Sequence, residues 1–259
     1  MSACYIALGT TRSDSEQIFG QALDRLESLM GSPILALSST HLTQPVGGVA
    51  TETFANAAAR FDTDIPPAEL LECLHQIEAD LGRVRTKRWG SRDIDLDLLL
   101  HGNQIVNTGQ VIVPHPRLWH RRFVLDPLVE IAPDVTHPTR KSTIVELRDR
   151  LLARPLPCGL TGGIAPLRDQ ILDACRSRFP EVCWINAANP AEILATLPAI
   201  VFQIPEDGHP TGGDADKVSF SEPVAPLIEG RLLDLSSEPT DRVTTVRDVL
   251  NSALGTSRP

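Results

Sequence analysis

The stretch that decides the fold is residues 78–100, which read EADLGRVRTKRWGSRDIDLDLLL. It ends in the clearest strand of the chain, Ile94–Leu100, where apolar residues alternate with Asp95 and Asp97. Side chains two residues apart on a strand point to the same face of the sheet. The pattern therefore predicts a strand with one buried apolar face and one face that carries both carboxylates.

Further strands and helices are expected on either side of this segment. The predicted strands are Cys4–Leu8, Ile34–Ser39, Phe54–Phe61 and Ile94–Leu100. One helix is expected over Asp14–Met30, with Ile18, Ala22, Leu26 and Leu29 at helical spacing, and a second from Pro66 to Gly82, with Leu70, Leu74, Ile77 and Leu81 on one face. The order strand, helix, strand, strand, helix, strand predicts a ferredoxin-like α+β sandwich. Residues 123–131 are expected to be partly helical.

A second, smaller domain is expected after a linker at Arg154-Pro155-Leu156-Pro157. We place the first domain at residues 1–155 and the second at residues 156–259. In the second, expected strands (Val182–Ile185, Ala199–Ile204, Leu232–Leu235) alternate with expected helices (Pro166–Phe179, Pro190–Leu197, Thr240–Leu254). Such alternation is typical of a small α/β domain with a parallel sheet.

The composition excludes several classes of protein. A net charge of -9 argues against a protein that coats nucleic acid or an anionic membrane. The apolar runs break within about a dozen residues, which is too short for a membrane span. The five cysteines form no CxxC pair, and their odd number favours a reduced, cytoplasmic protein over a disulfide scaffold.

The acidic pair has two interpretations. Asp95 and Asp97 could hold Mg²⁺, which prefers hard oxygen ligands, or they could be two solvated aspartates on an exposed strand face. The preceding basic run could bind phosphate oxygens or be a solvated loop; it consists of Arg83, Arg85, Lys87, Arg88 and Arg92, with Trp89 inside it. A phosphate-binding cluster next to an acidic pair favours a Mg-nucleotide site, since such a ligand needs both.

A third cluster follows in Val113-Pro114-His115-Pro116 and Arg121-Arg122-Phe123. His115 and Arg121 could add two donors to a phosphate chain, although a histidine between prolines is often a structural hydrogen-bonding residue. The chain has three lysines, and none lies in the GK[ST] context of a Walker A loop. Arginines would therefore have to hold a nucleotide triphosphate.

These segments resemble one family over about residues 5–152. The segments GRVR, RWGSRDIDLDLLLHG and VPHPRLWHRRFVLDPLVEIAPD are similar to the signature of the hydroxymethyldihydropterin pyrophosphokinases. The segments YIALG, SSTHLTQPVGG, FANAAARFDT and PPAELLECLHQIE agree with it in order and spacing. The chain departs from the family pattern at Gly9-Thr10-Thr11, where Gly-Ser-Asn is usual, and at Gln44.

The resemblance implies an ATP-dependent enzyme of folate biosynthesis that transfers pyrophosphate to 6-hydroxymethyl-7,8-dihydropterin. It implies catalytic roles for Arg83, Arg92, Asp95 and Asp97, the two aspartates holding two Mg²⁺ ions. It implies ATP binding by Glu78, Arg85, Trp89, Arg92, His115 and Arg121. It implies a pterin pocket made of Thr43, Val46, Phe54, Asn56, Trp89 and Phe123. The resemblance also implies the ferredoxin-like fold that the element order predicts.

Two other functions remain open at the level of sequence. One is a catalytically inactive nucleotide-binding module that regulates a partner, and the other is a D-x-D glycosyl or nucleotidyl transferase. In the second domain, CGLTGGIAPLR at residues 158–168 is similar to the first strand and loop of small P-loop kinases, but Pro166-Leu167-Arg168 replaces Gly-Lys-Ser. This similarity could equally be due to chance. If it is real, the domain is a non-catalytic remnant for stability, self-association or binding of a partner protein.

Overall fold

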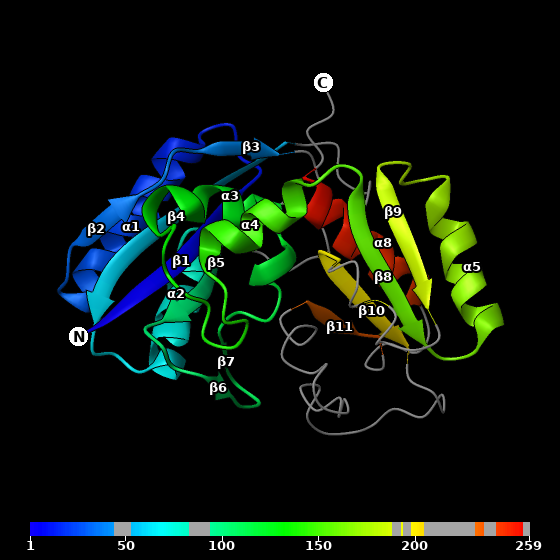
Figure 1. Cartoon of the computed structure of the whole chain (residues 1–259). Helices are drawn as coiled ribbons and strands as arrows, with labels where there is room; N and C mark the ends of the chain where they lie inside the picture. Colours follow the sequence, from blue (N-terminus) through cyan, green and yellow to red (C-terminus); the bar gives the residue numbers. More distant parts are fainter. Residues whose placement is uncertain are drawn as a thin grey trace. The chain divides into compact units, whose positions relative to one another are not determined.

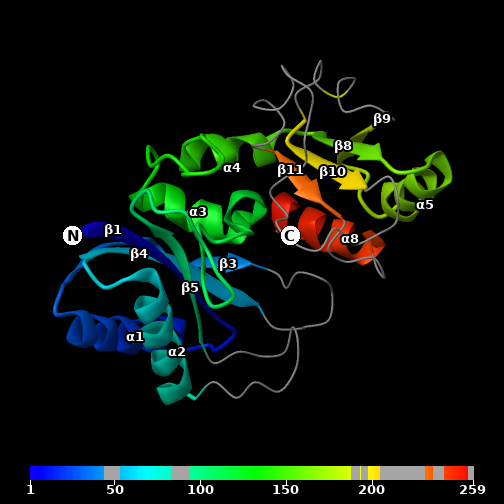
Figure 2. The same cartoon turned by 90° about the horizontal axis from the view of Figure 1, so that it is seen from below.

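The computed structural model describes residues 1–43, 53–82, 94–187, 193, 198–204, 231–235 and 242–255. The chain divides into two compact units, one comprising Met1–Arg148 with Gly255 and the other Asp149–Leu254. The sequence placed this boundary after residue 155 instead. Each unit is described separately below, and both are drawn in Figures 1 and 2.

The first unit is built on an antiparallel sheet with the strand order β2-β4-β1-β5, to which the short strand β3 adds by pairing with β4. Helices α1 and α2 lie on one face of this sheet and α3 on the other (Figure 2). The predicted α+β class is therefore confirmed. The elements are β1 (Ser2–Thr10), α1 (Ser15–Met30), β2 (Ile34–Leu37), β3 (His41–Thr43), β4 (Phe54–Thr63), α2 (Pro67–Asp80), β5 (Asp95–His101), β6 (Val106–Asn107), β7 (Ile112–Val113) and α3 (Arg122–Ile131). Helix α4 (Ile144–Leu152) contains the boundary between the two units.

The core of this unit lies between the sheet and the two helices α1 and α2. Alternate residues of the three central strands face it: Cys4, Ile6 and Leu8 of β1, Ala55, Ala57, Ala59 and Phe61 of β4, and Leu96 and Leu98 of β5. Leu70, Leu74 and Ile77 of α2 and Ile18, Ala22 and Leu26 of α1 face the same core, as their spacing predicts. The prediction for Leu29 was wrong, because its side chain is 53% exposed.

Local sequence explains where α1 and α2 begin and end. Helix α1 stops at Gly31, which adopts a left-handed conformation (φ 61°) and donates its N–H to the carbonyl of Glu27 at 2.8 Å. Helix α2 opens at the Pro66-Pro67 pair, where proline suits the first turn. Strand β2 ends at Leu37, earlier than the predicted end at Ser39. Ser38 instead bonds to Ala58, and Ser39 bonds to Glu130.

The second unit contains a parallel sheet with the strand order β11-β10-β8-β9. Its elements are β8 (Leu156–Gly162), α5 (Ala165–Arg176), β9 (Val182–Ala187), β10 (Ile200–Ile204), β11 (Leu232–Asp234) and α8 (Arg242–Leu254). Arg247 of α8 donates to the carbonyl of Ala174 in α5 at 3.2 Å, which holds the two helices together. The predicted linker was partly wrong, because Leu156 is fully buried and begins β8. The predicted helix over 190–197 falls outside the described residues, apart from Ile193.

The glycines that follow β8 are required by close packing. Gly162 and Gly163 have φ angles of 72° and 56°. A Cβ on Gly162 would collide with the carbonyl oxygen of Ile204, and one on Gly163 would lie 2.6 Å from the Ile204 side chain. The approach of β10 therefore explains both glycines without any bound phosphate.

The described residues contain neither a membrane-spanning helix nor a disulfide bond. In that part of the chain, no helix combines the length and the hydropathy that crossing a membrane requires. All five cysteines are described, and each is a free thiol. Burial raises the pKa of Cys4 to about 12, so this thiol is protonated at neutral pH.

The core of the first unit predicts how truncation changes stability. Leu74→Ala should lower the free energy of unfolding by about 2–5 kcal/mol, because Leu74 is fully buried and truncation leaves a cavity. Leu35→Ala is the matched control, since Leu35 is 51% exposed, and it should change stability by less than about 0.5 kcal/mol. Urea denaturation of both variants measures the difference. Equal losses would contradict this account of the core.

The turn after β8 gives a second prediction. Gly162→Ala should destabilise the chain by at least about 2 kcal/mol, because it adds a collision to a left-handed backbone. Gly109→Ala is the control, since a Cβ there has no heavy atom within 4 Å among the described residues. Thermal unfolding of the two variants should separate them by several degrees. A harmless Gly162→Ala would show that the turn can rearrange.

Candidate functional site

The face of the sheet opposite the core carries several of the predicted site residues. Asn56 of β4, Gly9 of β1 and Asp95 of β5 are partners in register across three strands. Asp97 pairs with Ala7, two residues further along both strands. Paired residues of an antiparallel sheet share a face, so Asn56 and the two aspartates lie on the same side.

Gly9 lies between the two polar side chains of this row. A Cβ built on Gly9 would lie 3.7 Å from Oδ1 of Asn56 and 3.8 Å from Cβ of Asp95. A larger side chain at this position would stand between the amide and the carboxylate.

Asp97 lies beside the cation that precedes α3. Arg121 Nη1 is 3.9 Å from Asp97 Oδ2, and the Arg121 guanidinium also lies 5.5 Å from the centroid of the Phe123 ring. The structure therefore brings together three of the predicted residues, one from β5 and two from the start of α3. A cation beside a carboxylate of this kind suits an anionic ligand that carries its own metal ions.

His115 is held next to the same strand by backbone contacts. Its N–H donates to the carbonyl of Leu99 at 2.9 Å, at the point where a β-bulge shifts the register of β5 against β1. Burial, and to a lesser degree the charges of Arg121 and Arg117, lower the pKa of His115 to about 3, although Asp95 opposes them. The imidazole is therefore neutral at physiological pH.

The tautomer of this neutral ring follows from its contact with Arg117. The Arg117 backbone N–H donates to His115 Nδ1 at 3.2 Å, so Nδ1 is an acceptor. The proton of the neutral ring then belongs on Nε2. His115 can thus donate one hydrogen bond to an oxygen such as that of a phosphate.

Glu78 contacts the acidic strand from the opposite side. Its side chain is 1% exposed, and its Oε1 accepts the backbone N–H of Leu96 at 2.8 Å. Leu96 lies between Asp95 and Asp97, so Glu78 holds the backbone that carries both carboxylates. This contact positions the strand, whereas the ATP-binding role expected for Glu78 stays a prediction.

The predicted pterin residues include a second group that the structure brings together. Asn56 Nδ2 donates to Thr43 Oγ1 at 2.9 Å, and Thr43 pairs with Phe54 in the β3–β4 register. These three residues share the polar face of the sheet with Asp95 and Asp97. Five other predicted residues lie outside the described residues: Val46, Arg83, Arg85, Trp89 and Arg92.

A magnesium site fits the donor set but is not complete in protein ligands. The described residues contain no group of three or more His, Cys, Asp or Glu that could hold a metal ion alone. Mg²⁺ commonly binds through one or two carboxylates and completes its shell with water and substrate phosphates. Asp95 and Asp97 on one face of β5 suit that mode of binding.

The turn between β8 and α5 does not have the features of a phosphate-binding loop. The carbonyls of Gly162 and Gly163 accept from Arg168 Nη1 at 2.8 and 2.7 Å, and Arg168 Nε donates to Asn186. Pro166 has no N–H, and the N–H groups of Leu167 and Arg168 donate to the Ile164 carbonyl. The first turn of α5 therefore has fewer amide donors for an anion than such a loop requires.

Sequence reasoning missed one group of polar residues on this side of the sheet. Ser39, His41 and Glu130 form hydrogen bonds with one another, although the first two are about 90 residues from the third. They lie inside segments that the family resemblance includes, SSTHL and VEIAPD. Neither segment indicates which distant residue its side chains contact.

The Glu78 contact generates a prediction about stability. Glu78→Ala should cost about 1–3 kcal/mol, because it leaves the buried N–H of Leu96 without its acceptor. Glu78→Gln keeps an oxygen in place and should cost less. Chemical denaturation of the two variants tests the difference. Equal losses would show that the charge of Glu78 matters more than its hydrogen bond.

Comparison with known proteins gives one consistent family for the first unit. Residues 5–133 match the family model of 7,8-dihydro-6-hydroxymethylpterin-pyrophosphokinase. The 2-amino-4-hydroxy-6-hydroxymethyldihydropteridine pyrophosphokinase of Pseudomonas aeruginosa is 39% identical over 134 residues, which cover 52% of this chain and 83% of that protein. The protein of the same name from Bacillus subtilis is 44% identical over 131 residues, covering 51% of this chain and 78% of that protein.

Solved structures of longer proteins are more distantly similar. A crystal structure of HPPK-DHPS in complex with substrates is 11% identical with a TM-score of 0.45, covering 96% of this chain and 66% of that one. Plasmodium falciparum HPPK-DHPS with pterin and p-hydroxybenzoate is 13% identical with a TM-score of 0.47, covering 88% and 59%. This chain spans less than two thirds of either solved chain. By the family match and the identity to curated relatives over more than three quarters of their length, the chain belongs to the 7,8-dihydro-6-hydroxymethylpterin-pyrophosphokinase family.

Proposed function

We propose that the first unit transfers pyrophosphate from ATP to 6-hydroxymethyl-7,8-dihydropterin, giving AMP and the pterin diphosphate in folate biosynthesis. The observation that carries the proposal is the pair Asp95 and Asp97 on one face of β5, with Arg121 3.9 Å from Asp97. The relatives in the family are named for this pyrophosphokinase activity. The order β2-β4-β1-β5, with two helices on one face, supports a ferredoxin-like sandwich as the scaffold.

The reaction balances as a single displacement. The hydroxymethyl oxygen of the pterin attacks the β-phosphorus of ATP, and the bond from that phosphorus to the oxygen bridging it to the α-phosphate breaks. AMP leaves with that oxygen, and the hydroxyl proton is released. Transfers of this kind require mainly positioning and neutralisation of charge.

Two Mg²⁺ ions, held by Asp95 and Asp97, would neutralise charge on the triphosphate. Arg121 and the Nε2–H of His115 would bind phosphate oxygens from the α3 side of the sheet. The sequence resemblance alone assigns Arg83 and Arg92 to catalysis, and Arg85, Trp89 and Arg92 to ATP binding. No residue is assigned as a general base.

The pterin would lie at the β3–β4 end of the polar face. Asn56 offers both an amide donor and an acceptor, which suits the edge of a pterin ring. Thr43 and Phe54 lie beside it, and Phe123 at the start of α3 would cover one face of the ring. Val46 and Trp89 are assigned to this pocket by resemblance.

For the second unit we propose a non-catalytic role in stability, self-association or binding of a partner protein. The turn closed by Arg168 and the absence of a lysine there support this proposal over nucleotide binding. The expectation of a cytoplasmic protein that binds neither nucleic acid nor membrane comes from the charge and cysteine pattern.

The test measures AMP formed from ATP and Mg²⁺ with and without the pterin. The wild-type protein should form AMP only when the pterin is present, and chelation of Mg²⁺ should abolish it. Asp97→Asn should lower the rate at least about 100-fold, since it removes a charge that the metal requires. Asp80→Asn is the control, because Asp80 pairs with Arg25 on the helix side and is exposed.

Each contrary outcome is informative. Folded wild-type protein that binds ATP but forms no AMP would overturn the proposal in favour of an inactive regulatory module. AMP formation that does not depend on the pterin would indicate a different acceptor, as in the D-x-D transferase alternative. Unchanged activity in Asp97→Asn would remove the aspartate pair from the site.

A further inference from the structure

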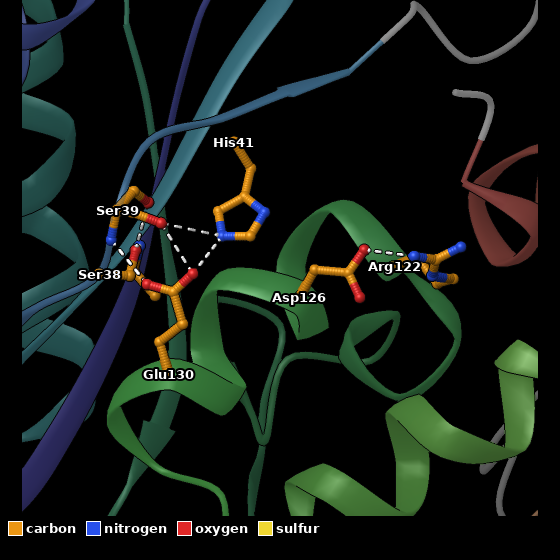
Figure 3. A network of polar contacts seen from close by, with 7 residues as sticks. Ser38, Ser39, His41, Arg122, Asp126 and Glu130 are labelled. Atoms are coloured by element: carbon orange, nitrogen blue, oxygen red, sulfur yellow. Dashed lines mark hydrogen bonds and ion pairs between the residues drawn. The ribbon is translucent and has the colours of Figure 1, made fainter. Parts of the chain in front are cut away.

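Glu130, in the last turn of α3, accepts hydrogen bonds from the segment that leads into β3 (Figure 3). The Ser39 backbone N–H donates to Oε2 at 2.8 Å, and the Ser39 hydroxyl donates to Oε1 at 2.7 Å. His41 Nε2 lies 2.6 Å from the same Oε1. Both oxygens of one carboxylate are therefore used to hold residues 39–41.

The carboxylate is ionised in this arrangement. Burial raises the pKa of Glu130, but the hydrogen bonds from the Ser39 backbone, the Ser39 hydroxyl and His41 together lower it below its usual value. The side chains of His41 and Glu130 are about one third exposed, at 30% and 37%, so solvent weakens their attraction. Directional hydrogen bonds, more than the attraction between charges, therefore hold Ser39, His41 and Glu130 together.

The segment is also fixed to β4 on its other side. The Ser38 N–H donates to the carbonyl of Ala58, and the Ala58 N–H donates to the Ser38 hydroxyl, each at 2.9 Å. Ser38 and Ser39 thus face two different elements, β4 and α3. Together they determine where the chain enters β3.

This entry point matters because β3 is short. It has three residues, and among the described strands it pairs only with β4. Thr43 lies two residues after His41 and on the same face, where Asn56 donates to its hydroxyl at 2.9 Å. A strand this short has few ladder hydrogen bonds of its own, so its register depends on what holds its start.

We propose that Glu130 is a positioning residue for the pterin substrate: it fixes β3 so that Thr43 and Asn56 remain hydrogen bonded at the pterin end of the site. This inference rests on the proposed function. Glu130 does not touch the reacting atoms, and it acts through Ser39 and His41. Its loss should therefore weaken pterin binding while it leaves the ATP end of the site intact.

The primary test is Glu130→Gln in the full-length chain. The amide replaces one acceptor oxygen with a donor, so one of the contacts with Ser39 or His41 must break. We expect the KM for the pterin to rise roughly tenfold, the factor for one charge-assisted hydrogen bond. The KM for ATP should stay within about twofold, because the contacts of Arg121 and Asp97 are unchanged.

Asp126→Asn is the matched control. Asp126 lies on the same helix, and its replacement by Asn removes one negative charge, as Glu130→Gln does. Asp126 pairs with Arg122 at 2.8 Å and not with residues 39–41 (Figure 3). Both KM values of this variant should stay near those of the wild type. Ser39→Ala should raise the pterin KM less than Glu130→Gln does, and the double variant should add little.

Hydrogen exchange supplies a readout that does not depend on activity. The backbone amides of residues 41–43 should exchange about tenfold faster in Glu130→Gln and at the wild-type rate in Asp126→Asn. Wild-type protein without pterin-dependent AMP formation would remove the proposed function, and exchange would still decide whether Glu130 fixes β3. An active enzyme in which Glu130→Gln leaves the pterin KM unchanged, or raises both KM values alike, would overturn the inference.

Discussion

The first unit depends on the two-faced character of its central strands. In β1, β4 and β5, alternate side chains either pack on α1 and α2 or lie on the opposite face, where buried Tyr5 and Ala58 accompany Asn56, Asp95 and Asp97. Burial of the apolar set fixes the register, because a shift by one residue would exchange the two faces. The positions of Asn56, Asp95 and Asp97 therefore follow from the packing of residues that make no contact with a ligand.

Features with a regular period were predictable from the sequence. The apolar spacing in α1 and α2, the Pro66-Pro67 start and the alternation in β5 as far as Leu98 all have local causes, and the structure confirms them. Beyond Leu98 the β-bulge ends the alternation, and Leu100 pairs with Tyr5. Leu29 was wrongly assigned to the core: it lies in the last turn of α1, where the apolar face of the helix is partly exposed to solvent. The family resemblance implied metal binding by Asp97 and ATP binding by Arg121, but the contact between the two side chains was not predicted.

Features that depend on distant partners could not be predicted. Strand β2 was expected to continue to Ser39, but the Ser39 amide donates to Glu130, which is 91 residues away in the sequence. The start of β8 at Leu156 was taken for a linker because two prolines flank that residue, yet Leu156 is fully buried. Likewise Gly162 and Gly163 resembled a phosphate loop, whereas their conformation reflects contact with Ile204. In each case a tertiary contact overrides the local signal.

Helix α3 has a consequence for cooperativity between the two substrates. Arg121 precedes its first turn and Glu130 lies in its last, so one rigid element, about 15 Å long, joins the phosphate end to the pterin end. A ligand that restrains the helix at one end reduces the conformational entropy left to be lost at the other. Any such coupling is a free energy shared by both sites, so each substrate would change the affinity for the other by the same factor.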